Sequence, residues 1–163
     1  GFSEAAWQFR ALFIKTIWPL WGIGVLNACD NLLGFVGYRF GGGLIDKIGH
    51  KRVIILYEAL NGFFYIIAIL LKNIFSPILM VLPAFFWSAK SLSQEAIFQK
   101  EYSDEERATM GSFISFYTSV VYSAASILIG FCADLYGIAM GLLFAALMQL
   151  FAIPLYIKSF QKF

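Results

Sequence analysis

The sequence predicts an all-α protein that crosses a lipid bilayer several times. Of its 163 residues, 60% are hydrophobic and 13% are charged, whereas soluble domains contain roughly 45–50% apolar and about 25% charged residues. One soluble core of this size cannot bury such an excess, so much of it must face lipid. The apolar residues form runs of about 20 residues, the length that a helix needs to cross roughly 30 Å of hydrocarbon. These runs do not fit the shorter, alternating strands of a membrane barrel.

Five apolar runs are expected to be spanning helices of one polytopic bundle. They lie at residues 20–45, 53–71, 77–98, 109–132 and 138–157. Pro19 and Pro77 stand at the starts of the first and third runs, where proline costs a helix little. Ser103 and Glu106 have the spacing of a capping box, which predicts that the fourth helix begins near residue 104, outside the apolar slab.

The ends of the chain differ from this transmembrane region, which is expected to cover residues 19–158. Residues 1–18 place Glu4, Arg10 and Lys15 among aromatic residues, too many charges for a complete further span. This segment is either an amphipathic helix at the membrane surface or the end of a preceding helix. The chain starts at Gly1 and has no signal-peptide pattern, so it is expected to belong to a longer polypeptide. Residues 159–163 are expected to form a cytoplasmic tail.

The distribution of basic residues predicts the orientation. The loops at 46–52 and 99–108 and the end of the chain lie on one side and carry seven lysines and arginines, against three on the other side. The first side and the C-terminus are therefore expected to be cytoplasmic, in a multi-pass protein of the plasma or inner membrane. A net charge of +2 is too small and too scattered for nucleic-acid binding. Cys29 and Cys132 lie in apolar runs and are expected to be buried thiols.

The loop between the first two runs combines glycines with charges. Gly49 is expected to allow a tight reversal between helices, and Gly42 a close approach of neighbouring helices. Asp46 lies at the membrane boundary and needs a partner, either a nearby base or the N-terminus of a facing helix. The residues of this gating motif are Gly42, Asp46, Lys47, Gly49, Lys51 and Arg52.

This loop resembles the signature loop of the major facilitator superfamily (MFS), approximately G-x-L-A-D-[R/K]-x-G followed by three bases. Ile45 replaces the usual small residue and His50 replaces a base. Residues 105–112 are similar to the entry of the eleventh helix in that family. The resemblance covers the chain from about residue 20 and implies a partial MFS fold, helices eight to twelve. An alternative placement of the loop, as the first copy of the motif, would end the chain after helix six; the short polar tail and Arg107 favour the C-terminal placement.

The resemblance implies that the loop is a latch that opens during a transport cycle. The alternative is that its bases only set the topology. Arg39, Glu58, Glu95 and Arg107 are expected to support the latch as a charge network around Asp46, and a buried neutral Glu58 could instead carry a proton.

Polar residues inside the runs follow helical spacing and are candidates for a substrate or ion cavity. Asp30 and Lys90 lie near the middle of two oppositely directed runs. They could pair with each other, or hold a charged substrate or a proton, or form a purely structural ion pair. The candidate cavity residues are Asn27, Asp30, Asn31, Trp87, Lys90, Gln94 and Ser119.

The function expected from these patterns is secondary active transport of a small solute by alternating access. Its partners would be a small-molecule substrate, the lipid bilayer and the remaining helices of the same transporter, with a coupling proton left open. Neither a cofactor nor a metal is expected. A non-transporting scaffold or receptor on the same fold is the main alternative. An enzyme is disfavoured, because the only histidine is His50 and no HExxH, GxSxG or Walker loop occurs.

Overall fold

The computed structural model describes residues 1–160, apart from the side chains of Asp104 and Ser159, and these residues contain no strand. The helices are α1 (Phe2–Lys15), α2 (Leu20–Ile48), α3 (His50–Leu71), α4 (Ser76–Val81), α5 (Ala84–Glu101), α6 (Asp104–Tyr136) and α7 (Ile138–Phe160). The all-helical prediction is confirmed for this part of the chain. The end of the tail expected at 159–163, with Lys162, lies outside the described residues.

Four helices have the length and apolar composition needed to cross a membrane, namely α2, α3, α6 and α7. They correspond to four of the five predicted runs and have the character of a multi-pass membrane protein. At 1.5 Å per residue the 33 residues of α6 extend over about 50 Å, well beyond the hydrocarbon slab. The predicted capping box opens this helix: the Ser103 N–H donates to the Glu106 carboxylate at 3.2 Å.

The prediction of one continuous helix over residues 77–98 is wrong. The chain there is divided into the six residues of α4 and the eighteen of α5, with Pro83 at the N-cap of α5. Proline has no N–H to donate to the preceding turn, and its ring clashes with the carbonyl four residues earlier. Neither piece has the length and apolar composition of a spanning helix by itself.

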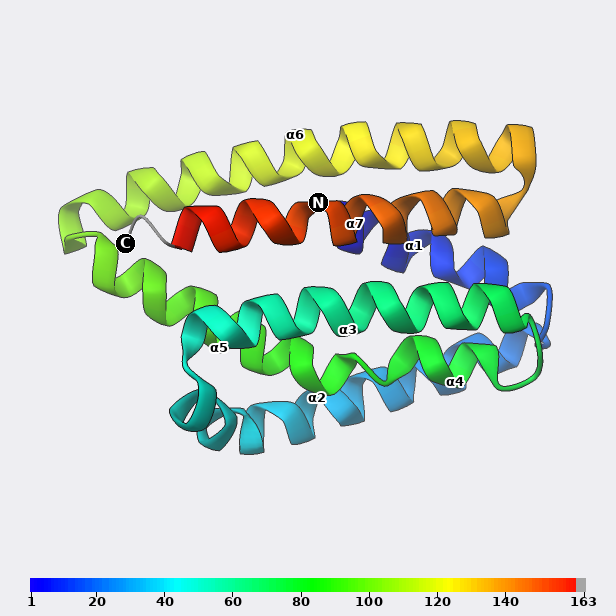
Figure 1. Ribbon diagram of the computed structural model, residues 1–163, viewed down its shortest axis with the longest axis horizontal. Coiled ribbons are helices and arrows are strands. Elements are labelled where there is room, and N and C mark those ends of the chain that lie inside the picture. The colour runs from blue at the N-terminus through cyan, green and yellow to red at the C-terminus, as the bar shows by residue number, and fades with distance from the viewer. Residues whose placement is uncertain (161–163) are drawn as a thin grey trace.

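The long helices lie side by side in a layer, with α2 and α6 at opposite edges (Figure 1). Across the layer, α2 packs on α5, α5 on α3, α3 on α7, and α7 on α6. The core of the layer contains many small residues, including Ala68, Ala145 and Ala146, which let helices approach closely. α1 also contributes to this core, because its buried Ala5 and Phe13 pack with residues of α6 and α7.

The chain repeats one construction in two segments, which we call the first segment (α1–α3) and the second segment (α4–α7). Each has a short or broken helix, then a long helix, then a third helix. The short helices are exchanged between the segments: α1 packs on α6 and α7, whereas α5 packs on α2 and α3. The two third helices, α3 and α7, pack on each other.

The long helix of each segment is joined to the third helix by a single glycine in a left-handed conformation. Gly49 has φ 84° and ψ 154°, and Gly137 has φ 88° and ψ 157°. The expectation that Gly49 allows the reversal is confirmed, because few residues other than glycine adopt this conformation. Each glycine also ends the pattern Gly-x-x-x-Asp-x-x-Gly, which contains Asp46 in the first segment and Asp134 in the second.

The expectation that both cysteines are buried is wrong for Cys29. Cys29 is exposed and Cys132 is half-buried. Cys29 borders an apolar groove whose other lining residues include Val25, Leu32 and Leu82. The apolar run on α2, at the edge of the layer, is only 17% buried, so membership of the run does not imply burial within the protein.

Candidate functional site

A buried ion pair joins α1 to α2. Arg10 Nη2 lies 3.0 Å from Asp30 Oδ2 and donates a longer hydrogen bond, of 3.3 Å, to Asn27 Oδ1. The same Asp30 oxygen accepts the Trp7 Nε1–H at 2.9 Å. The Arg10 guanidinium also lies over the Trp7 ring, 5.5 Å from its centroid. Asp30 therefore pairs with Arg10 rather than with Lys90.

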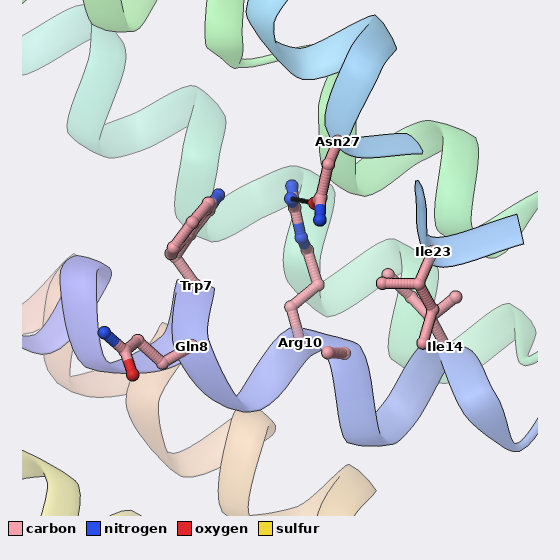
Figure 2. Close-up of a pocket in the computed structure, with 7 residues that line it drawn as sticks. Trp7, Gln8, Arg10, Ile14, Ile23 and Asn27 are labelled. Carbon is pink, nitrogen blue, oxygen red and sulfur yellow. Dashed lines mark hydrogen bonds between the residues drawn. The ribbon is translucent and has the colours of Figure 1, made fainter. Parts of the chain in front are cut away.

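Helical spacing explains why these side chains meet. Trp7 and Arg10 are three residues apart on α1, and Asn27 and Asp30 are three residues apart on α2, so each pair shares one helix face. The two faces lie opposite each other, and Trp7 and Arg10 both extend from α1 toward α2 (Figure 2). Arg10 is only 2% exposed, so its charge depends on Asp30 for compensation.

A pocket of about 220 Å³ lies beside this pair, between α1 and α2 (Figure 2). Of the described residues that line it, Arg10 alone carries a charge. Its polar lining is completed by amide groups and an indole, and its remaining walls are aliphatic. The lining residues are Trp7, Gln8, Arg10, Ala11, Ile14, Ile23 and Asn27.

A second buried ion pair joins α3 to α5 and extends to α7. Lys90 Nζ lies 2.7 Å from Glu58 Oε1 and 4.6 Å from the centroid of the Tyr57 ring. The other Glu58 oxygen accepts a hydrogen bond of 2.7 Å from the Gln149 amide, and the Gln149 oxygen accepts one of 3.0 Å from Asn61. Both oxygens of the Glu58 carboxylate thus have a partner. Glu58 belongs to this network and not to one around Asp46.

The other cavity candidates are more dispersed. Trp87 is about half-exposed and packs edge-on against Tyr38, with ring centroids 6.2 Å apart. Asn31 and Gln94 are exposed. The Ser119 hydroxyl donates to the Ser115 carbonyl of its own helix at 2.9 Å. The structure therefore does not gather these residues at either ion pair.

The motif residues at the end of α2 lie on an exposed surface. Within residues 1–160, Asp46, Lys47 and Arg52 make no ion pair, and a side chain at Gly42 would meet open space. Lys51 instead donates to the Phe160 carbonyl at 3.0 Å. This places a positive charge at the C-terminal end of α7, where the helix dipole favours it.

The supporting charges also have separate roles. Arg39 lies 5.8 Å from the centroid of the Phe40 ring, and Glu95 accepts a hydrogen bond from Gln99 at 3.1 Å. Arg107 donates to the carbonyls of Gln99 and Tyr102 at the end of α5. In the described part of the chain no hydrogen bond or ion pair joins these residues to Asp46, so the predicted network around Asp46 is not formed there.

Sequence reasoning missed Arg10 and Gln149 as members of these sites. Gln149 is the only side-chain amide in the apolar run 138–157, and an isolated polar group in such a run indicates a partner on another helix. The charge of Arg10 counts against a complete further span in residues 1–18, but a charge can enter the layer when its counter-charge lies on a neighbouring helix. In comparisons with protein-family models, curated proteins and solved structures, no match to this chain was found.

Proposed function

We propose that this chain is part of a secondary transporter that moves a small solute by alternating access, with the MFS arrangement of helices. The observation that carries the proposal is the buried Arg10–Asp30 pair beside an open pocket. Asp30 lies about 15 Å along α2 from its first residue, roughly halfway across a 30 Å slab. Buried charges at this depth are costly and mark substrate or ion pathways.

The repeated construction supports the same proposal. Transporters of this type are built from internal repeats, with the substrate site near the bilayer midplane where the repeats meet. Here the short helices are exchanged between the two segments, and the Glu58–Lys90 pair joins helices of different segments that this exchange brings together. We further propose that α4 and α5 together form the fifth membrane crossing and that α1 is the end of a preceding helix.

The exposed edges of the layer support a role for further helices. The most apolar stretches of α2 and α6 are only 17% and 11% buried, against 50% for α3. In the proposed arrangement, α2 and α6 contact the other half of the transporter, and the unpaired Asp46 forms its latch there.

The first experiment measures transport by the complete protein in proteoliposomes. Uptake of a mixture of labelled small metabolites would be compared with and without a pH gradient. Asp30→Asn should abolish uptake while the protein remains folded, whereas Lys15→Gln, which removes an exposed charge from α1, should not. Unchanged uptake in Asp30→Asn would contradict the proposed site.

A second experiment tests alternating access without knowledge of the substrate. In a variant with Cys29 and Cys132 replaced by Ala, Ile23→Cys would place one thiol in the pocket wall. A membrane-impermeant thiol reagent should label it from either side of the membrane, because the pocket opens alternately to the two sides. Labelling from one side only, together with no uptake in the first experiment, would favour a non-transporting scaffold or receptor.

A further inference from the structure

We infer that the pocket between α1 and α2 binds the carboxylate of a small organic acid through Arg10, and that this anion enters together with a proton taken up by Asp30. The inference deepens the proposed function, because it names the ligand class of the same site. It rests on the charge of the pocket, the bonding of Asp30 and the size of the cavity.

The charge that the pocket offers to a ligand is positive. Arg10 is the charged group among its described lining residues, and Asp30 is not one of them. Both nearby donors, Trp7 Nε1 and Arg10 Nη2, point at one Asp30 oxygen. A cationic ligand would meet the guanidinium first, so the geometry favours an anion.

A carboxylate matches the donors that Arg10 presents. A guanidinium has five N–H groups arranged to hold a carboxylate by two parallel hydrogen bonds. Arg10 Nη2 already donates hydrogen bonds to Asp30 and Asn27. Arg10 can therefore offer two parallel N–H groups to a ligand carboxylate only when its bond to Asp30 is released. The ligand carboxylate therefore competes with Asp30 for Arg10.

Charge balance couples that competition to a proton. The Arg10–Asp30 pair is neutral overall, and adding an anion would leave a net negative charge in a buried site, which is costly. Protonation of Asp30 removes its charge and restores neutrality when the ligand carboxylate replaces it. Among the described residues, no other group near the pair offers an uncompensated charge: α3 contributes the Tyr65 hydroxyl beside Arg10, Lys90 of α5 is held by Glu58, and α4 carries no charged residue.

The cavity limits the size and character of the acid. Its volume of about 220 Å³ is below the ~300–1,000 Å³ of pockets that take drug-sized ligands. One part of the lining, formed by Ala11, Ile14 and Ile23 with the ring of Trp7, is apolar, and the amides of Gln8 and Asn27 lie beside Arg10 in the polar part. The site thus suits a small monocarboxylate with an aliphatic or aromatic body, held by an acid group at Arg10.

The test measures binding to the complete protein in detergent, with benzoate and butyrate as probes and the neutral amides of the same acids as controls. Dissociation constants would be determined by ligand-induced shifts of the thermal unfolding midpoint at about pH 5.5 and about pH 8, above the usual pKa of an aspartate. At least one carboxylate should bind, and its affinity should fall as the pH rises, by up to about tenfold per pH unit, because one proton is linked to binding. Binding of the amides with equal affinity, or of neither carboxylate, would overturn the inference.

Three variants separate the roles of the pair. Asp30→Asn mimics the protonated acid and should bind the carboxylate with little dependence on pH. Arg10→Gln should lose binding at both pH values, and Arg10→Lys, which keeps the charge but not the fork, should bind at least tenfold more weakly than the wild type. Lys15→Gln serves as the matched control. If Arg10→Gln does not fold, a pH-dependent Asp30→Asn variant would by itself reject the inference.

Failure of this inference is distinguishable from failure of the transporter proposal. Binding is measured at equilibrium and needs no movement across a membrane. Carboxylate binding without uptake in proteoliposomes would support the anion site and contradict the transporter proposal. Uptake of a cation or a neutral solute without carboxylate binding would contradict the anion site and support the transporter proposal.

Discussion

The first and second segments share a construction but differ in where they carry charge. The long helix of the first segment holds Asp30 in its middle, paired with Arg10 and next to a pocket. The long helix of the second segment has no acidic or basic residue between Met110 and Ala133. Gly49, at the first junction, is followed by His50, Lys51 and Arg52. Near Gly137, at the second junction, Asp134 is the only charged residue in the sequence. The packing plan is therefore repeated in the two segments, whereas only the long helix of the first segment carries a charge in its middle.

The two ion pairs differ in how accessible they are to a ligand or to water. The Glu58–Lys90 pair is closed, since Gln149 occupies the second carboxylate oxygen and the Glu58 side chain is 6% exposed. The Asp30 side chain is 16% exposed and lies near a pocket that a ligand or water can enter. We therefore interpret Glu58–Lys90 as a fixed connection between helices and Arg10–Asp30 as the exchangeable pair.

The largest expected effect comes from breaking the closed pair. Lys90→Met should lower the free energy of unfolding by about 3–5 kcal/mol, because it leaves the Glu58 carboxylate buried without its cation. Arg10→Met should cost less, because the Asp30 side chain is already partly exposed and water can solvate it. Unfolding in detergent would be followed by circular dichroism, with the exposed Lys100→Met as the control.

A double variant sharpens this result. Lys90→Met combined with Glu58→Gln should recover much of the lost stability, since a neutral amide no longer needs the cation. An equal cost for Lys90→Met and Arg10→Met would contradict the distinction between a fixed and an exchangeable pair.

A smaller effect is expected at the two glycine junctions, and it should be the same in both segments. Gly49→Ala and Gly137→Ala should each cost about 1–3 kcal/mol, because alanine is strained in this backbone conformation. At both positions a Cβ would meet open space, so the cost comes from the backbone alone. Gly24→Ala is the matched control, because Gly24 lies within α2 with nothing near its Cβ, and alanine there should be neutral or stabilising by up to about 1 kcal/mol. Costs that differ strongly between the two junctions would argue against a repeated construction.

The smallest effect on stability is expected at the paired aspartates. Asp46 and Asp134 are both exposed, and neither forms an ion pair in the described part of the chain. Changing either residue to Asn should alter the free energy of unfolding by no more than about 0.5 kcal/mol. Transport should nevertheless slow several-fold in Asp46→Asn and much less in Asp134→Asn, because only Asp46 is surrounded by the charges of the proposed latch. Equal transport rates in the two variants would place the latch elsewhere.

Local features of the fold followed from local patterns in the sequence. Four of the five predicted spanning helices were found, Ser103 and Glu106 predicted the start of α6, and Gly49 predicted the reversal after α2. Each of these depends on residues within a few positions of one another, or on the cost of exposing apolar surface and unpaired backbone groups in lipid. Pro83 carried the signal for the break between α4 and α5, but the length of the apolar run outweighed it in the prediction.

The partners of the buried charges were decided by the tertiary structure alone. Asp30 could have paired with Lys90 on sequence grounds, and only the packing of α1 against the layer brings Arg10 to it instead. Glu58 likewise meets Lys90 and Gln149 because α5 and α7 both pack on α3. The spacing of residues fixes which side chains share a helix face. Which faces meet depends on contacts between distant parts of the chain, and these contacts maximise packing and charge compensation for the whole layer at once.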